Sequence, residues 1–323
     1  MKDQAKVIGS WGVAAVLGLA MLPGAQAVGA GALPAPSAQQ SQSAQSAQPP
    51  QNAQAAPSGQ SSQPAPSLRT AQPAPAPAPP QPSPEEIQAY KAIVQEIDPS
   101  KQLVLVKDFE KKFPKSVYLS DVYFFGASAA ENKNDAPDAV TYGQESLKLN
   151  PNNLRSLILV AGLLPLPQAL QGTSTQKEQQ LTVSEDDANR ALQLLARLPA
   201  PSTETADQFT KSKQLIVAQI HAALGMAHLQ KAVLAPGGPD AAELTASEQE
   251  FKSAVATPQP NPQDYYRLGE VYTRENKLSD ALNAFTQCAQ LGQGTMIEKY
   301  ANAMIARLKA AQAKQGAPPP AKQ

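Results

Sequence analysis

The two histidines are the first residues to consider for chemistry. His221 and His228 lie seven positions apart in a segment whose spacing predicts a helix. Two helical turns therefore separate them by about 10.5 Å along the axis. A metal ion with ligands at about 2 Å cannot bridge that gap. We interpret both as structural histidines, exposed or hydrogen-bonded, and expect no metal site from them.

The remaining chemically reactive residues also have structural interpretations. The single cysteine, Cys288, excludes an intramolecular disulfide and a Cys-based metal site within one chain. We expect it to be buried, with intermolecular pairing or a reactive thiol as alternatives. The acids from Glu185 to Asp187 fall at an expected helix start, where they would interact with the helix dipole. No phosphate-binding loop, G-x-S-x-G or H-E-x-x-H occurs, so the sequence predicts no enzyme and no cofactor.

The charge is balanced, which bears on the class of partner. The 323 residues include 27 basic and 27 acidic side chains, and no local cluster of Lys or Arg stands out. Nucleic-acid binders depend on a basic surface for most of their affinity. We therefore expect a protein or peptide partner and no nucleic acid.

The N-terminal segment 1–27 has the three parts of a secretory signal peptide. Lys2 and Lys6 precede an apolar run from Val7 to Leu22, and Ala25-Gln26-Ala27 gives an A-x-A cleavage pattern. The sequence therefore predicts an exported protein that is periplasmic, on the cell surface or secreted. An uncleaved membrane anchor is the alternative, and only then is contact with a membrane expected. The segment resembles the signals of bacterial envelope proteins.

Residues 28–83 consist almost wholly of Ala, Pro, Gln, Ser and Gly, and Arg69 is their only charged residue. Such a segment has too little apolar surface to offset the entropy of ordering, so we expect a disordered linker. A tether is the simplest role for it. The alternative is a ligand for a proline-binding or cell-wall partner.

From Pro84 the spacing of apolar residues becomes helical, with Ser83 as the expected N-cap. The sequence predicts an all-α domain over 84–314 and a disordered tail over 315–323. The expected helices are 84–98, 101–113, 116–131, 136–148, 152–163, 184–197, 203–234, 239–256, 262–275, 278–291 and 294–314, the last acting as a cap.

The segment 262–294 contains the strongest repeat signal. Small, aliphatic and aromatic residues occur at fixed spacing in its two expected helices: Tyr265, Leu268, Gly269, Tyr272, Ala281, Phe285 and Cys288. This pattern resembles the tetratricopeptide repeat. The small residues Gly269 and Ala281 would let two antiparallel helices approach closely, and larger side chains would fill the space beside them.

A second copy spans 120–153, with residues in register at Tyr123, Ala127, Ala139, Ser146 and Pro151. Two further pairs are degenerate. In one, the first helix is overlong, although Phe251 and Ala254 fit the second helix. In the other, about twenty residues from Leu164 to Ser184 separate the helices. Because one repeat cannot bury its apolar face alone, we expect an α-α superhelix, a solenoid of stacked repeats.

The resemblance implies that a partner segment binds in a concave groove formed by the first helices. The corresponding positions are Gln263, Tyr266, Glu270, Thr273 and Arg274 in one repeat and Asp121, Phe124, Ser128, Glu131 and Asn132 in the other. The expected function is an adaptor or scaffold for protein interactions in the bacterial envelope. The alternatives are a non-catalytic repeat domain of an enzyme or assembly factor acting on the cell wall, or a self-assembling structural spacer.

Overall fold

The computed structural model describes residues 81–201 and 205–315, which contain helices and short loops but no strand. The predicted signal peptide, nearly all of the predicted linker, and the tail from 316 lie outside these residues. None of the described helices is long and apolar enough to cross a membrane. The helices are α2 (Pro84–Gln95), α3 (Pro99–Lys112), α4 (Leu119–Asn132), α5 (Ala136–Leu149), α6 (Leu154–Leu163), α7 (Ser174–Arg197), α8 (Ala206–Leu234), α9 (Ala241–Val255), α10 (Pro262–Arg274), α11 (Leu278–Leu291) and α12 (Met296–Gln315).

Every predicted helix is present, and one boundary was substantially wrong. Helix α7 begins at Ser174 and not at residue 184, so the interruption after α6 covers only 164–173. Thr173 explains the early start, because its hydroxyl accepts from Gln176 N at 3.3 Å while Gln176 Oε1 accepts from Thr173 N at 2.8 Å. This capping box satisfies two backbone donors at once. All other helix ends lie within three residues of their predicted positions.

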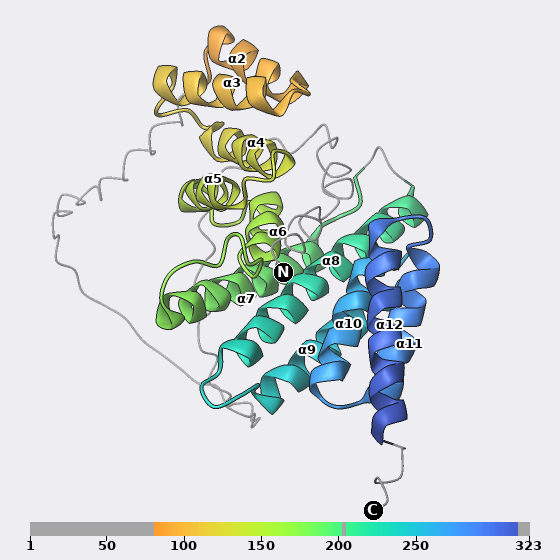
Figure 1. The fold of residues 1–323 in the computed structure, drawn as a ribbon. Coiled ribbons are helices and arrows are strands. Elements are labelled where there is room, and N and C mark those ends of the chain that lie inside the picture. The colour runs from red at the N-terminus through yellow and green to blue at the C-terminus, as the bar shows by residue number, and fades with distance from the viewer. Residues whose placement is uncertain (1–80, 202–204, 316–323) are drawn as a thin grey trace, which may run out of the picture. The chain divides into compact units, whose positions relative to one another are not determined.

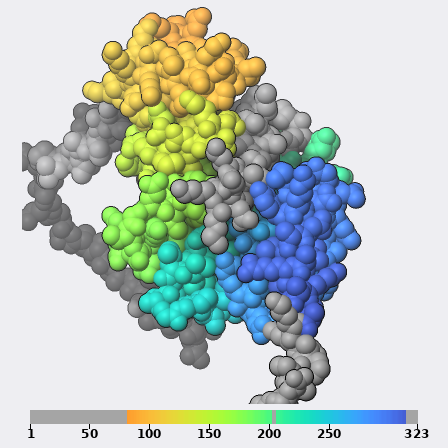
Figure 2. Space-filling view, in the orientation of Figure 1, coloured from red at the N-terminus to blue at the C-terminus, as the bar shows by residue number. Residues whose placement is uncertain are grey.

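The helices pack in chain order as antiparallel pairs. The pairs are α4 with α5, α6 with α7, α8 with α9, and α10 with α11, while α12 packs against α11 and α10 as the predicted cap. The first helices also contact one another, because α4 meets α6, α6 meets α8, and α8 meets α10 (Figure 1). In Figure 2 the orange, yellow and green helices form consecutive bands. The first helices thus provide a shared face.

Two glycines show how closely paired helices approach. A Cβ added to Gly269 in α10 would lie 2.8 Å from the Phe285 ring of α11, and one added to Gly225 in α8 would lie 2.9 Å from the Phe251 ring of α9. Only a residue without a side chain fits at that separation. The α8/α9 pair is therefore a third copy of the arrangement in the strongest repeat, despite the length of α8.

A serine hydrogen bond relates the two degenerate pairs to each other. Ser247 of α9 donates to the Gly225 carbonyl at 2.7 Å, and Ser184 of α7 donates to the Ala161 carbonyl at 2.8 Å. Both serines are fully buried. In each pair a buried serine of the second helix thus donates a hydrogen bond to a backbone carbonyl of the first helix.

The apolar interior of the described residues forms two main clusters that meet on α8. One cluster extends from Ile93 to Leu224 and includes Ile216 and Ile220, and the other extends from Ala222 to Leu308 and includes Met226. Helix α8 has 29 residues, enough to contribute to both clusters. It therefore connects the N-terminal helix pairs to the C-terminal ones.

Candidate functional site

The predicted groove residues of α4 take part in a contact with α6. Asp121 Oδ1 accepts from Arg155 Nη2 at 2.7 Å and from Asn153 Nδ2 at 3.2 Å. The Arg155 guanidinium lies over the Phe124 ring, with its Cζ 4.4 Å from the ring centroid. Such cation–π contacts are strongest when partly desolvated. Arg155 thus covers Phe124 and neutralises Asp121 from the neighbouring first helix.

The prediction that every chosen residue of α4 lines an exposed groove was wrong for two of them. Phe124 is 2% exposed and Ser128 is 6% exposed, so both pack inside the fold. The reason is that α6 packs against α4 on this side. Asp121 and Glu131 are half-buried, and Asn132 is exposed at the end of the helix.

Glu131 is the least satisfied of these side chains. Its carboxylate makes no hydrogen bond or ion pair to any residue in 81–201 or 205–315, and burial raises its pKa from 4.5 to about 7. It lies in the last turn of α4, a turn that contains no basic residue. A negative charge at a helix C-terminus also opposes the dipole. Neither the helix dipole nor local pairing favours an acid at this position.

The predicted residues of α10 mostly contact their own repeat. Tyr266 is half-buried and meets the Phe285 ring edge-on, with centroids 5.3 Å apart. Glu270 accepts from Arg267 at 2.6 Å, and its backbone carbonyl accepts from the exposed Arg274 at 3.2 Å.

Two more predicted residues of α10 are also half-buried. The Thr273 hydroxyl donates to the Gly269 carbonyl at 2.7 Å, and the Gln263 backbone N–H donates to the Asn261 cap at 3.0 Å. The structure does not bring the α4 and α10 residues together. Helix α4 contacts α6, α6 contacts α8, and only α8 contacts α10 among these first helices.

Asp264 was not among the predicted site residues, yet it is the most deeply buried acid of α10. It is 4% exposed, and its carboxylate has no hydrogen bond within the described part of the chain. Burial raises its pKa from 3.8 to about 7, although the nearby Arg267 guanidinium acts in the opposite direction. Its position one residue before the repeat signature gives no hint of this burial.

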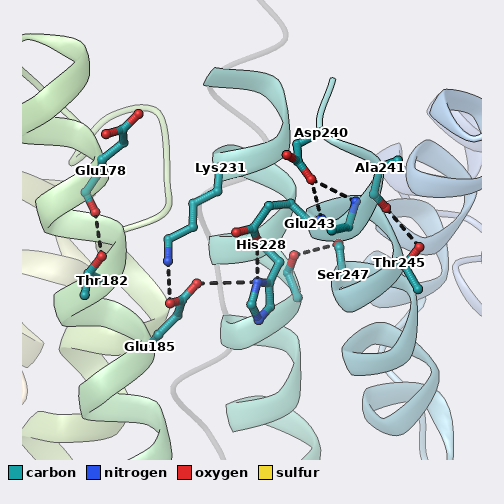
Figure 3. A network of polar contacts seen from close by, with 12 residues as sticks. Glu178, Thr182, Glu185, His228, Lys231, Asp240, Ala241, Glu243, Thr245 and Ser247 are labelled. Atoms are coloured by element: carbon teal, nitrogen blue, oxygen red, sulfur yellow. Dashed lines mark hydrogen bonds and ion pairs between the residues drawn. The ribbon is translucent and has the colours of Figure 1, made fainter. Parts of the chain in front are cut away.

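The two histidines contact different carboxylates. His221 Nδ1 lies 2.7 Å from Glu250 Oε2 of α9. His228 Nδ1 lies 2.7 Å from Glu243 Oε2 of α9 and 3.5 Å from Glu185 Oε1 of α7 (Figure 3). The expectation that the histidines do not share a site therefore agrees with the structure.

The predicted role of Glu185 at a helix start was wrong, because α7 begins at Ser174 and Glu185 lies well inside it. Its second carboxylate oxygen instead accepts from Lys231 of α8. Residue spacing carried no signal for this contact, because 46 positions separate the two residues in the chain.

Comparisons with known proteins concern the fold alone. No family model and no curated protein matches the sequence. A thermophilic TPR protein of Thermus thermophilus, TTC0263, is a structural neighbour with a TM-score of 0.44 and 14% identity, covering 70% of this chain and 96% of its own.

Two further solved structures are also similar. The MamA RS-1 ArsTM double mutant has a TM-score of 0.38 and 16% identity, covering 65% of this chain and 95% of its own. Yeast Tom70 has a TM-score of 0.35 and 14% identity, covering 71% of this chain and 48% of its own. The contacts described above carry the conclusion: residues 81–201 and 205–315 form an all-α stack of antiparallel helix pairs, the architecture that the resemblance to tetratricopeptide repeats implies.

Proposed function

We propose that this chain is an exported, non-catalytic adaptor whose first helices bind a segment of another protein. The observation that carries the proposal is the half-buried Glu131 carboxylate, which has no partner within the described residues and whose pKa burial raises to about 7. A partly buried carboxylate without a partner is unfavourable for a fold, and such groups concentrate where a ligand uses them. A partner would supply the missing cation.

The chemistry of Glu131 defines the partner segment further. A Lys or Arg side chain placed beside this carboxylate would form a charge-assisted hydrogen bond and remove the cost of burying the charge. Asp121 is already paired with Arg155, so it adds less attraction than its charge suggests. The proposed ligand is therefore a peptide segment with a basic residue that reaches the end of α4.

A binding selection on the full chain tests this proposal. A random peptide library is selected against the protein, and the enriched peptides are measured against Glu131→Gln by fluorescence anisotropy. The matched control is Glu178→Gln, since Glu178 is exposed on α7. We expect basic peptides to be enriched and to bind Glu131→Gln at least about tenfold more weakly, as for loss of a charged hydrogen bond.

Two results would contradict the binding proposal. One is enrichment of peptides without basic residues. The other is equal affinity of the enriched peptides for Glu131→Gln and Glu178→Gln. Glu131→Gln removes an unpaired, partly buried charge, so impaired folding is not expected to explain weaker binding.

Export rests on the sequence of 1–27 and has its own test. Cell fractionation followed by mass spectrometry of the N-terminus should find the chain outside the cytoplasm, beginning at about Val28. A chain that retains Met1 and fractionates with the membrane would instead indicate an anchor.

A further inference from the structure

Three helices bring a set of metal-ligating groups together around His228. Glu185 comes from α7, His228 from α8 and Glu243 from α9, and one ligand atom of each lies within 4.8 Å of the others. Figure 3 shows both carboxylates reaching the same ring nitrogen, Nδ1 of His228. The cluster does not include Glu131, which lies on α4.

The distances suit a single ion. Zinc binds imidazole nitrogen and carboxylate oxygen at about 2.0–2.2 Å, so neighbouring ligands of a tetrahedral site lie roughly 3.3 Å apart. His228 Nδ1 is 2.7 Å from Glu243 Oε2 and 3.5 Å from Glu185 Oε1. Small side-chain rotations would reach the required separations. An ion would replace the proton that His228 now shares with Glu243.

Glu185 shows that one acceptor in this cluster is unused. Its Oε1 atom is buried and has no hydrogen bond, although it faces His228 at 3.5 Å. Its other oxygen accepts from Lys231, which fixes the orientation of the carboxylate. Hydrogen bonds of this kind to a ligand carboxylate are typical of the outer shell of metal sites. Lys231 therefore leaves Oε1 as the atom free to bind an ion.

The donor set selects among metals. One imidazole nitrogen with two carboxylate oxygens suits zinc and its neighbours such as cobalt, whereas calcium and magnesium prefer sites made of oxygen alone. The three ligand side chains are between 16% and 31% exposed, so an ion and water ligands can reach the cluster from solvent. Two carboxylates face a single ammonium, which leaves negative charge for a dication to neutralise.

We propose that Glu185, His228 and Glu243 bind a zinc-class divalent cation that holds α7, α8 and α9 together. Helix α7 belongs to one helix pair, and α8 and α9 form the next. An ion bound at this position connects consecutive repeats at a joint that the ion pair between Lys231 and Glu185 already spans.

The molecule contains its own control for this proposal. His221 lies on the same helix as His228 and also has a carboxylate partner on α9, Glu250, at 2.7 Å. It has no second carboxylate in the described residues, so it provides two ligands where His228 has three. Replacing either histidine with glutamine removes one imidazole from α8 and leaves a polar side chain.

The experiment uses the full, tag-free chain after treatment with a chelator. Zinc binding is measured by isothermal titration calorimetry, and cobalt binding by the visible absorption of the Co²⁺ site. We expect one ion per chain for the wild type and for His221→Gln. We also expect affinity to fall at least about tenfold in His228→Gln and in Glu243→Gln, and the melting temperature of the wild type to rise with zinc.

Several outcomes would overturn the proposal. They are the absence of stoichiometric zinc or cobalt binding by the wild type, equal binding by the wild type and His228→Gln, or loss of binding in His221→Gln. Circular dichroism checks that each variant is folded. Glu243→Gln provides the answer if His228→Gln fails to fold, because Glu243 lies at the helix surface and contributes a ligand without filling the core.

Discussion

The buried carboxylate of Asp264 should make the stability of the fold fall as the pH rises. Burial raises its pKa to about 7 in the folded chain, against 3.8 for an exposed aspartate. Between these values the folded state binds a proton that the unfolded state lacks. Stability is then present at low pH and is lost as the pH rises through the pKa of the folded state.

The loss of unfolding free energy depends on how many pH units lie between the starting pH and the folded-state pKa of Asp264. From pH 5 to pH 8 the folded-state group loses its proton, and roughly two pH units of that interval lie below the folded pKa. At 1.36 kcal/mol per unit this costs about 3 kcal/mol of unfolding free energy. Asp264→Asn removes the titration and keeps the shape of the side chain.

Urea denaturation followed by circular dichroism at pH 5 and pH 8 measures the effect. The wild type should lose about 3 kcal/mol more than Asp264→Asn between the two pH values. Other groups that titrate in this window contribute equally to both proteins and cancel. The control is Asp108→Asn, since Asp108 is exposed on α3. If the wild type and Asp264→Asn respond equally to pH, the carboxylate is solvated and the reasoning is refuted.

Three further predictions concern packing. Gly269→Ala should destabilise the chain by about 1–3 kcal/mol in urea, because its Cβ would lie 2.8 Å from the Phe285 ring, whereas Gly162→Ala, with nothing within 4 Å, should stabilise it by about 0.5–1 kcal/mol. Ser146→Ala should cost about 1–3 kcal/mol in the same assay, because the buried hydroxyl donates to the Ser120 carbonyl at 2.7 Å. Cys288 is buried, and its pKa is raised to about 12, so iodoacetamide should alkylate it only after denaturation. A stabilising Gly269→Ala, a destabilising Gly162→Ala, no loss in Ser146→Ala, or rapid alkylation of the native thiol would contradict these expectations.

The helix pairs could be predicted from the sequence because their determinants are local. Gly269 and Phe285 lie within one repeat, and their types and spacing specify a close helix contact before any tertiary structure is known. Ser83 could be identified as an N-cap for the same reason, and its hydroxyl accepts from Glu86 N at 3.1 Å. Missing the capping box at Thr173 led to the late start assigned to α7, although the signal was present in the sequence.

The side-chain environment of the first helices could not be predicted in this way. Phe124 is buried because Arg155 reaches it from the next helix pair, and nothing near Phe124 in the chain indicates that contact. Spacing along the sequence relates His228 only to His221, which lies on the same helix. The carboxylate that approaches it from α7 comes from a distant part of the chain, so only the packing of three helices brings the groups together.

The contribution of α8 to both apolar clusters has a consequence for the chain as a folding unit. A fragment that ended before α8 would expose the surface that Ile216 and Ile220 cover, and a fragment that began after it would lose Met226 and Leu229 from the other cluster. Neither fragment retains a complete apolar cluster. Cutting the chain before or after α8 should therefore not give two folded fragments. Repeats of this type can unfold one by one. Because α8 contributes to both apolar clusters, unfolding of one cluster should also destabilise the other. The described residues should therefore behave as one cooperative unit.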